Sequence, residues 1–128
     1  MKNNLFNRPL AIALAIVSTL LTGSLSKAAD TLTWSGGSGT SANWSDALNW
    51  LNSGSAHAVP VAGDNLIFSG SAQTINTDDI TGLAGGWLQF ANGDFWLNGA
   101  TTLTLSGVTN ISGANVFFMP LALGAAQV

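Results

Sequence analysis

The fold of this chain is decided by the stretch Leu97-Asn-Gly-Ala-Thr-Thr-Leu-Thr-Leu-Ser-Gly-Val-Thr-Asn-Ile-Ser-Gly-Ala-Asn115, which is followed by Leu121-Ala-Leu-Gly-Ala-Ala-Gln127. It contains two apolar-x-apolar triplets, Leu103-x-Leu105 and Leu121-x-Leu123, separated by Gly, Asn and Ser and almost free of charge. Side chains alternate between two faces along a strand, so each triplet predicts a very short strand with one apolar face.

Short segments of the same kind run back to residue 31, each bounded by Gly, Asn or Asp turns. The other predicted strands cover residues 31–34, 66–70, 73–77, 87–90, 95–97, 108–111 and 116–118. Residues 45–50 predict one helical turn capped by Ser45, too short to be stable alone. The sequence therefore predicts an all-β protein.

Two arrangements of these strands compete. The Asn92-Gly93 turn favours hairpins and an antiparallel β-sandwich. Recurring triplets favour a short right-handed parallel β-helix, although their starts at Leu66, Leu88, Leu103 and Leu121 are unevenly spaced along the sequence. The scarcity of charge supports the β-helix, because stacked coils would align like charges.

The N-terminus predicts a signal-peptide helix. Lys2 and Arg8 precede an apolar run over residues 10–21, and the small-x-small sequence Ser26-Lys-Ala28 predicts cleavage after Ala28, with Ala29 as a near alternative. This run is well short of the roughly 20 residues that span a bilayer, so we expect no membrane span after cleavage. The protein is expected to be secreted or held at the cell surface.

The chain that remains after cleavage would be entirely acidic. It carries all six Asp and neither Lys nor Arg, which gives a net charge of −6. It has no electrostatic means of gripping a phosphate backbone, so we expect no nucleic-acid partner. Cysteine is absent, so the fold must be stabilised without disulfides.

The predicted organisation has three parts: a signal peptide over 1–28, a Trp/Gly-rich N-terminal cap over 29–65, and an apparently truncated β-strand repeat region over 66–128. In the cap, Trp34, Trp44 and Trp50 lie close together in the sequence. We expect them to plug the end of an elongated core, as capping repeats do in solenoids.

The motifs Asn43-Trp-Ser-Asp46, Pro60-x-x-Gly63-Asp64-Asn-Leu66-x-Phe68 and Leu103-x-Leu105-x-Gly107-Val-Thr-Asn110 occur in a distinctive order. In this the chain resembles the N-terminal region of autotransporter-associated β-strand repeat proteins. The resemblance implies an exported bacterial passenger that folds as a right-handed parallel β-helix at the cell surface. It implies no catalytic residue and no cofactor.

Catalytic and metal-binding chemistry finds little support in the sequence. His57 is the only histidine and lies in a Gly/Ser/Ala loop, which predicts a solvated residue rather than a nucleophile partner or zinc ligand. Asp78 and Asp79 could suggest a glycosidase pair, but neighbours on a strand point to opposite faces and a turn is the simpler interpretation. Calcium at Asp64 or Asp94 is a minor alternative to ordinary turn chemistry.

The five tryptophans offer the main functional alternative, a sugar-stacking platform. We expect Trp34, Trp44, Trp50 and Trp87 to pack inside. Trp96 lies between Phe95 and Leu97; if these two point inward, Trp96 points outward and marks a contact surface.

The sequence thus predicts a non-enzymatic, exported structural or adhesive β-helix segment. Its partners would be further β-helix coils of the same or a neighbouring chain. The alternative is a small carbohydrate-binding β-domain whose exposed tryptophans bind surface glycans. A fragment of a polysaccharide-degrading enzyme is a third hypothesis, which would need carboxylates clustered on one face.

Overall fold

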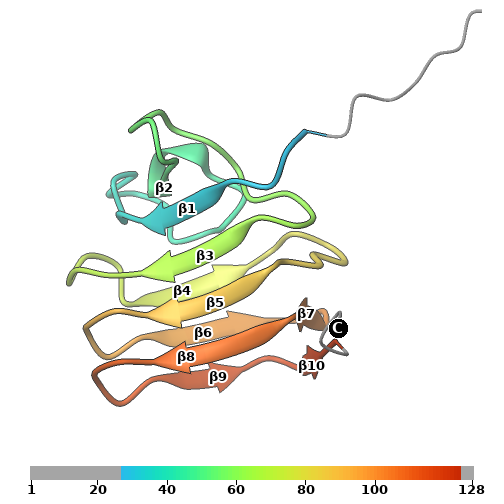
Figure 1. Cartoon of the computed structure of the whole chain (residues 1–128). Coiled ribbons are helices and arrows are strands. Elements are labelled where there is room, and N and C mark those ends of the chain that lie inside the picture. Colours follow the sequence, from blue (N-terminus) through green and yellow to red (C-terminus); the bar gives the residue numbers. More distant parts are fainter. Residues whose placement is uncertain (1–26, 125–128) are drawn as a thin grey trace, which may run out of the picture.

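The computed structural model describes residues 27–124 and shows an all-β chain, as predicted (Figure 1). One short 3-10 turn, η1 (Ala47–Asn49), is the sole helical element among these residues. The predicted signal peptide lies outside the described residues apart from its last two positions. The strands are β1 (Thr31–Trp34), β2 (Trp50–Leu51), β3 (Asn65–Phe68), β4 (Ile75–Asp78), β5 (Trp87–Phe90), β6 (Trp96–Gly99), β7 (Leu103–Leu105), β8 (Gly107–Asn110), β9 (Val116–Phe118) and β10 (Leu121–Leu123).

The strands form three sheets, and nearly all of their pairings are parallel. The first sheet has the order β2-β1-β3-β5-β8, the second β4-β6-β9, and the third β7-β10. Among the described strands only the β1–β2 pair is antiparallel, which makes the first sheet mixed. A parallel bridge between Ala84 and Thr104 adds a further segment beside β7. Figure 1 shows β3, β5 and β8 stacked down the molecule below β1.

The chain visits the sheets repeatedly in the same order. It runs from β3 to β4 and the Ala84 segment, then through β5, β6 and β7, and then through β8, β9 and β10. We call these three circuits passes one, two and three. The sequence separation between register partners is similar on all three sheets, as the pairs Leu66–Leu88, Trp96–Val116 and Leu103–Leu121 show.

This arrangement corrects two expectations. The turn at Asn92-Gly93 joins β5 to β6, which lie in different sheets, so it makes no hairpin and the antiparallel sandwich does not describe the fold. The shorter interval between Leu88 and Leu103 also joins two different sheets. The triplets are unevenly spaced along the sequence because Leu66 and Leu88 belong to one sheet and Leu103 and Leu121 to another.

The core consists of the inward side chains of each strand, stacked on those of the next pass. Leu32, Leu66 and Leu88 are register partners along the first sheet, and all three are fully buried. One alternate position further on, Phe68 and Phe90 stack with ring centroids 5.6 Å apart. Because inward positions repeat with each pass, apolar side chains form continuous ladders.

Three tryptophans close the core beside β1, as the sequence predicts. Trp34, Trp44 and Trp50 are buried, and Trp50 meets the other two edge to face at centroid distances of 5.0 and 5.6 Å. Each indole N–H finds an acceptor, which buried tryptophans require. The helical turn nearby is capped by Asp46, which accepts from the Leu48 N–H, and the expected Ser45 cap was wrong by one residue.

The corners of the passes are also stacked. Gly70, Gly93 and Gly113 follow the ends of β3, β5 and β8, with φ angles of 90°, 86° and 89°. Only glycine adopts this backbone without strain, and a Cβ on Gly113 would collide with the Gly93 carbonyl. Side chains tie one corner to the next: Asn92 Oδ1 accepts from the Gly70 N–H at 2.6 Å.

Candidate functional site

The outer face of the second sheet carries large apolar side chains in contact with solvent. Ile75, Trp96 and Val116 are register partners across β4, β6 and β9, and Asn98 is aligned with Phe118. Their inward neighbours, such as the fully buried Leu97, fix this alternation. The exposed fractions are 61% for Ile75, 46% for Trp96 and 55% for Phe118.

Trp96 and Phe118 form an aromatic pair on this face. Their ring centroids are 5.5 Å apart and their planes are inclined at 53°. Trp96 points outward, as expected from the inward positions of Phe95 and Leu97. Two inclined rings beside the amide of Asn98 could contact the C–H face of a sugar and its hydroxyl groups. The sequence did not single out Phe118, because its alignment with β6 depends on the tertiary pairing.

The other tryptophans contribute little to such a platform. Trp34, Trp44 and Trp50 lie inside the core and cannot meet a ligand. Trp87, expected to be packed, is instead 36% exposed, because it starts β5 on the outer face of the first sheet. The platform of five therefore reduces to Trp96 and Trp87, on two different sheets.

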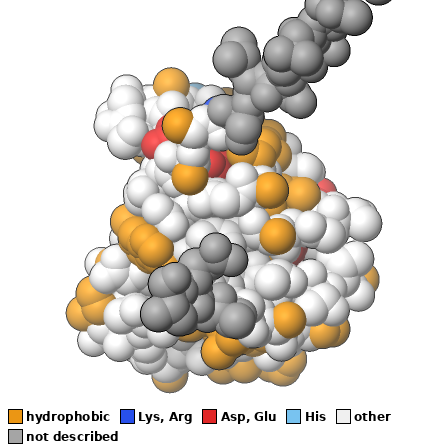
Figure 2. Space-filling model, turned by 45° about the vertical axis from the view of Figure 1, so that its right-hand side comes forward, with side chains coloured by type: hydrophobic (Ala, Val, Ile, Leu, Met, Phe, Trp, Pro, Cys, Tyr) orange, Lys and Arg blue, Asp and Glu red, His pale blue; other side chains and the backbone are white. Residues whose placement is uncertain are grey.

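A second exposed apolar surface lies at the end formed by pass three. Leu103 and Leu105 of pass two are fully buried, whereas their register partners Leu121 and Leu123 are 38% and 64% exposed. Val108 is 37% exposed, although its partner Leu88 is fully buried. Figure 2 shows hydrophobic side chains gathered at the lower end of the molecule, where β9 and β10 lie in Figure 1. Inward positions are exposed here because no strand among residues 27–124 covers them.

His57 and Asp94 lie at the surface, apart from any catalytic grouping. His57 is exposed, and its Nδ1 lies 3.1 Å from the carbonyl oxygen of Trp50. Asp94 is exposed and accepts from the Ala114 N–H at 2.7 Å, which links two corners. Both contacts are structural in character.

Asp78 differs from the turn residue that the sequence predicts. It ends β4, points inward and is 2% exposed, whereas Asp79 accepts hydrogen bonds from the backbone and hydroxyl of Ser45. Asp78 Oδ1 accepts from the Ile80 N–H at 3.0 Å, and its Oδ2 has no hydrogen-bond partner. Burial raises the pKa of Asp78 to about 6; the Ile80 N–H partly opposes this rise, and the Asp79 charge adds to it. The two carboxylates thus face different surroundings.

The described residues contain no pocket and no group of three or more His, Cys, Asp or Glu side chains placed to hold a metal ion. None of the helical structure between residues 27 and 124 is long and apolar enough to cross a membrane. The surfaces on which an activity could be argued are therefore the aromatic face and the exposed end of pass three.

Comparison with known proteins identifies no relative of this chain. No protein-family model, no curated protein and no solved structure matches this chain. The similarity to autotransporter-associated repeats therefore rests on the sequence motifs given above.

Proposed function

We propose that this protein is a right-handed parallel β-helix segment that serves as an exported structural or adhesive scaffold. The observation that carries the proposal is the in-register parallel pairing of successive passes, with β3, β5 and β8 in one sheet and β4, β6 and β9 in another. A chain that circles through the same sheets in the same order builds its core by stacking coils. In this proposal passes one to three are coils, and residues 29–65 form the N-terminal cap.

The two ends of the stack differ in a way that fits this role. At one end, β2 pairs with the outer edge of β1, and the buried ring of Trp50 in β2 packs against Trp44. At the other end, β8, β9 and β10 are the outer strands of their sheets among the described residues. Unpaired strand edges bind further strands readily, and the exposed Leu121 and Leu123 would be covered by them. The proposed partner is a further β-helix coil with leucines at the corresponding positions.

Export is the second part of the proposal. The basic N-terminal residues, the short apolar run and the cleavage sequence ending at Ala28 support it. Ala28 itself is exposed, which is compatible with access by a peptidase. The absence of charge from most of the mature chain suits a stacked scaffold, in which like charges on neighbouring coils would repel.

Duplicating one coil tests the scaffold directly. A second copy of the segment 87–106 is inserted between Ser106 and Gly107, which preserves the alignment of Trp87 with Gly107. The proposal predicts that the lengthened protein folds. Its free energy of unfolding should be at least that of the original chain and its urea m-value should be larger, because one more coil buries more surface. A shuffled insert of the same composition is the control. Equal loss of folding with both inserts would contradict the stacked arrangement.

The exposed Trp96–Phe118 pair favours a second candidate, a carbohydrate-binding β-domain. Under this candidate, a glycan array gives saturable binding that Trp96→Ala and Phe118→Ala abolish. Ile111→Ala is the matched control, because Ile111 is 61% exposed and lies outside the pair. The absence of saturable binding would leave the scaffold as the better account.

A further inference from the structure

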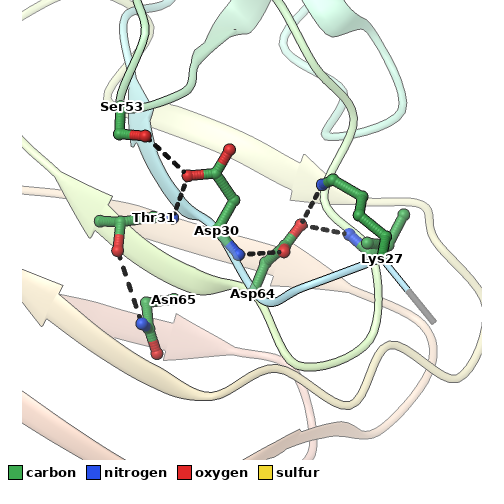
Figure 3. Close-up of polar contacts among 7 residues, drawn as sticks. Lys27, Asp30, Thr31, Ser53, Asp64 and Asn65 are labelled. Carbon is green, nitrogen blue, oxygen red and sulfur yellow. Dashed lines mark hydrogen bonds and ion pairs between the residues drawn. The ribbon is translucent and has the colours of Figure 1, made fainter. Parts of the chain in front are cut away.

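The carboxylate of Asp64 is fully buried and lies close to Lys27 and Asp30, near the N-terminal end of the described chain (Figure 3). Its side chain is fully buried, yet it lies in a Gly-Asp-Asn sequence that predicts an ordinary exposed turn. Oδ1 accepts from the Asp30 N–H at 2.8 Å, and Oδ2 accepts from the Val61 N–H at 3.0 Å. Both oxygens are thus held by the backbone.

The positive charge beside Asp64 comes from a residue that processing would remove. Lys27 Nζ lies 3.6 Å from Asp64 Oδ2, and the lysine side chain is 54% exposed. Cleavage after Ala28 takes Lys27 away with the leader, together with Lys2 and Arg8. The mature chain then has no lysine or arginine to pair with this buried carboxylate. Leaving a buried charge without a counter-charge is destabilising.

Cleavage also creates a new cation at the same place. Hydrolysis of the Ala28–Ala29 amide by a peptidase consumes one water molecule and leaves a carboxylate on Ala28 and an ammonium on Ala29. Ala29 directly precedes Asp30, whose backbone N–H donates to Asp64. A Cβ added to Gly63 would lie 3.8 Å from the Ala29 Cβ, so Ala29 also lies close to Gly63. The new terminus therefore starts directly beside the residue that touches the carboxylate.

We propose that Asp64 binds the mature amino terminus. The Ala29 ammonium replaces Lys27 at Oδ2 and holds the processed end of the chain against the turn that precedes β3. This inference rests on the proposed export and processing. In the unprocessed chain Lys27 fills the position, so the same carboxylate serves both forms. Cleavage after Ala29 would give an equivalent pair, because the Asp30 nitrogen would then be the ammonium, already 2.8 Å from Oδ1.

The hydrogen bonds of Asp30 hold the segment that would carry the new amino terminus in place. Its Oδ1 accepts from the Thr31 N–H at 2.7 Å and from the Ser53 hydroxyl at 3.0 Å. These two hydrogen bonds, in that order, are the main causes that lower the pKa of Asp30. The segment that carries the new terminus is thus anchored to both β1 and the loop after β2.

The mature chain provides a clean experiment, because its α-amino group would be its only primary amine. The chain is expressed with residues 1–28 in place, intact mass locates the cut, and the purified protein is treated with an amine-reactive ester at pH 7. Only the neutral amine reacts, so an ion pair that raises the amine pKa by one unit slows labelling about tenfold. We expect at least this slowing in the folded protein relative to the protein in denaturant.

Two variants make the result specific. Asp64→Asn keeps the size and one acceptor oxygen but removes the charge, and it should restore fast labelling of the folded protein. Asp94→Asn, an exposed aspartate that also accepts a backbone N–H, should leave labelling slow. A processed chain whose amine reacts equally fast in wild type and Asp64→Asn overturns the inference alone. An intact mass that retains Lys27 overturns the proposed processing and the inference with it.

Discussion

The indole N–H of Trp44 donates a hydrogen bond of 2.7 Å to Oδ1 of Asn76, and both side chains are buried. Trp44 belongs to the segment before η1 and Asn76 to β4, so this bond ties the tryptophan cluster to the second sheet. It also explains why a polar asparagine occupies an inward position of a strand whose register partner is Leu97.

Asn76→Ala should destabilise the protein by about 1–3 kcal/mol, because the buried indole N–H loses its acceptor. Gln89→Ala is the control, since Gln89 lies on the outer side of β5 between the buried Leu88 and Phe90. Urea unfolding followed by tryptophan fluorescence measures both. Equal stabilities for the two variants would show that the Trp44–Asn76 bond contributes nothing.

Adjacent residues of β6 should respond very differently to truncation. Leu97→Ala should cost about 2–5 kcal/mol, because Leu97 is fully buried and its removal leaves a cavity. Trp96→Ala should cost only about 1 kcal/mol, mainly through its contact with Phe118. Denaturant midpoints of the two variants test the inward and outward assignment, and a larger loss for Trp96→Ala would reverse it.

Gly113 at a corner and Gly107 at the start of β8 give a matched pair of backbone tests. Gly113→Ala should be strongly destabilising, because φ is 89° and the new Cβ would meet the Gly93 carbonyl. Gly107→Ala should be tolerated, since nothing lies within 4 Å of a Cβ at that position. Thermal unfolding distinguishes them; equal melting temperatures would contradict the stacking of the corners.

The buried carboxyl group of Asp78 should make the stability of the protein depend on pH in an unusual way. Its pKa is about 6 in the folded chain against 3.8 when exposed, so the folded state holds the proton more tightly. The contribution of Asp78 to the free energy of unfolding is fully present below pH 4 and is lost as the pH rises through about 6. The loss amounts to up to about 3 kcal/mol. Asp78→Asn should therefore gain stability over wild type at pH 7 but not at pH 4. Urea unfolding at both values tests this, and a constant difference between the two proteins would contradict it.

The sequence predicts nine of the ten strands, because each of these is encoded locally; it does not predict β2, since it favours a helical turn through Trp50. An apolar side chain at alternate positions, as in Leu103 and Leu105, fixes a strand and its inner face without reference to the rest of the chain. The assignment of strands to sheets is not local: Leu88 and Leu103 occur in similar triplets but lie on different faces.

The sequence also did not predict which polar side chains are buried in the core. Asp64, Asn76 and Asp78 all lie at positions whose residue types predict a turn or an exposed site, yet the structure buries all three. Their burial depends on partners from distant segments, such as Trp44 for Asn76 and Asp30 for Asp64. Trp96 could be placed outward from its neighbours alone, whereas Phe118 required the β6–β9 alignment.

The central claim is that successive passes stack as parallel strands in the stated register, and one cross-linking measurement tests it most directly. Gln89 and Thr109 are partners on the outer side of β5 and β8, and the chain contains no native cysteine. The Gln89→Cys/Thr109→Cys variant should form an intramolecular disulfide under mild oxidation, detected by intact mass. The Ile67→Cys/Thr109→Cys variant should not, because two strand spacings, about 9.6 Å, exceed the reach of a disulfide. Equal cross-linking of the two variants, or none in the first, would contradict the account.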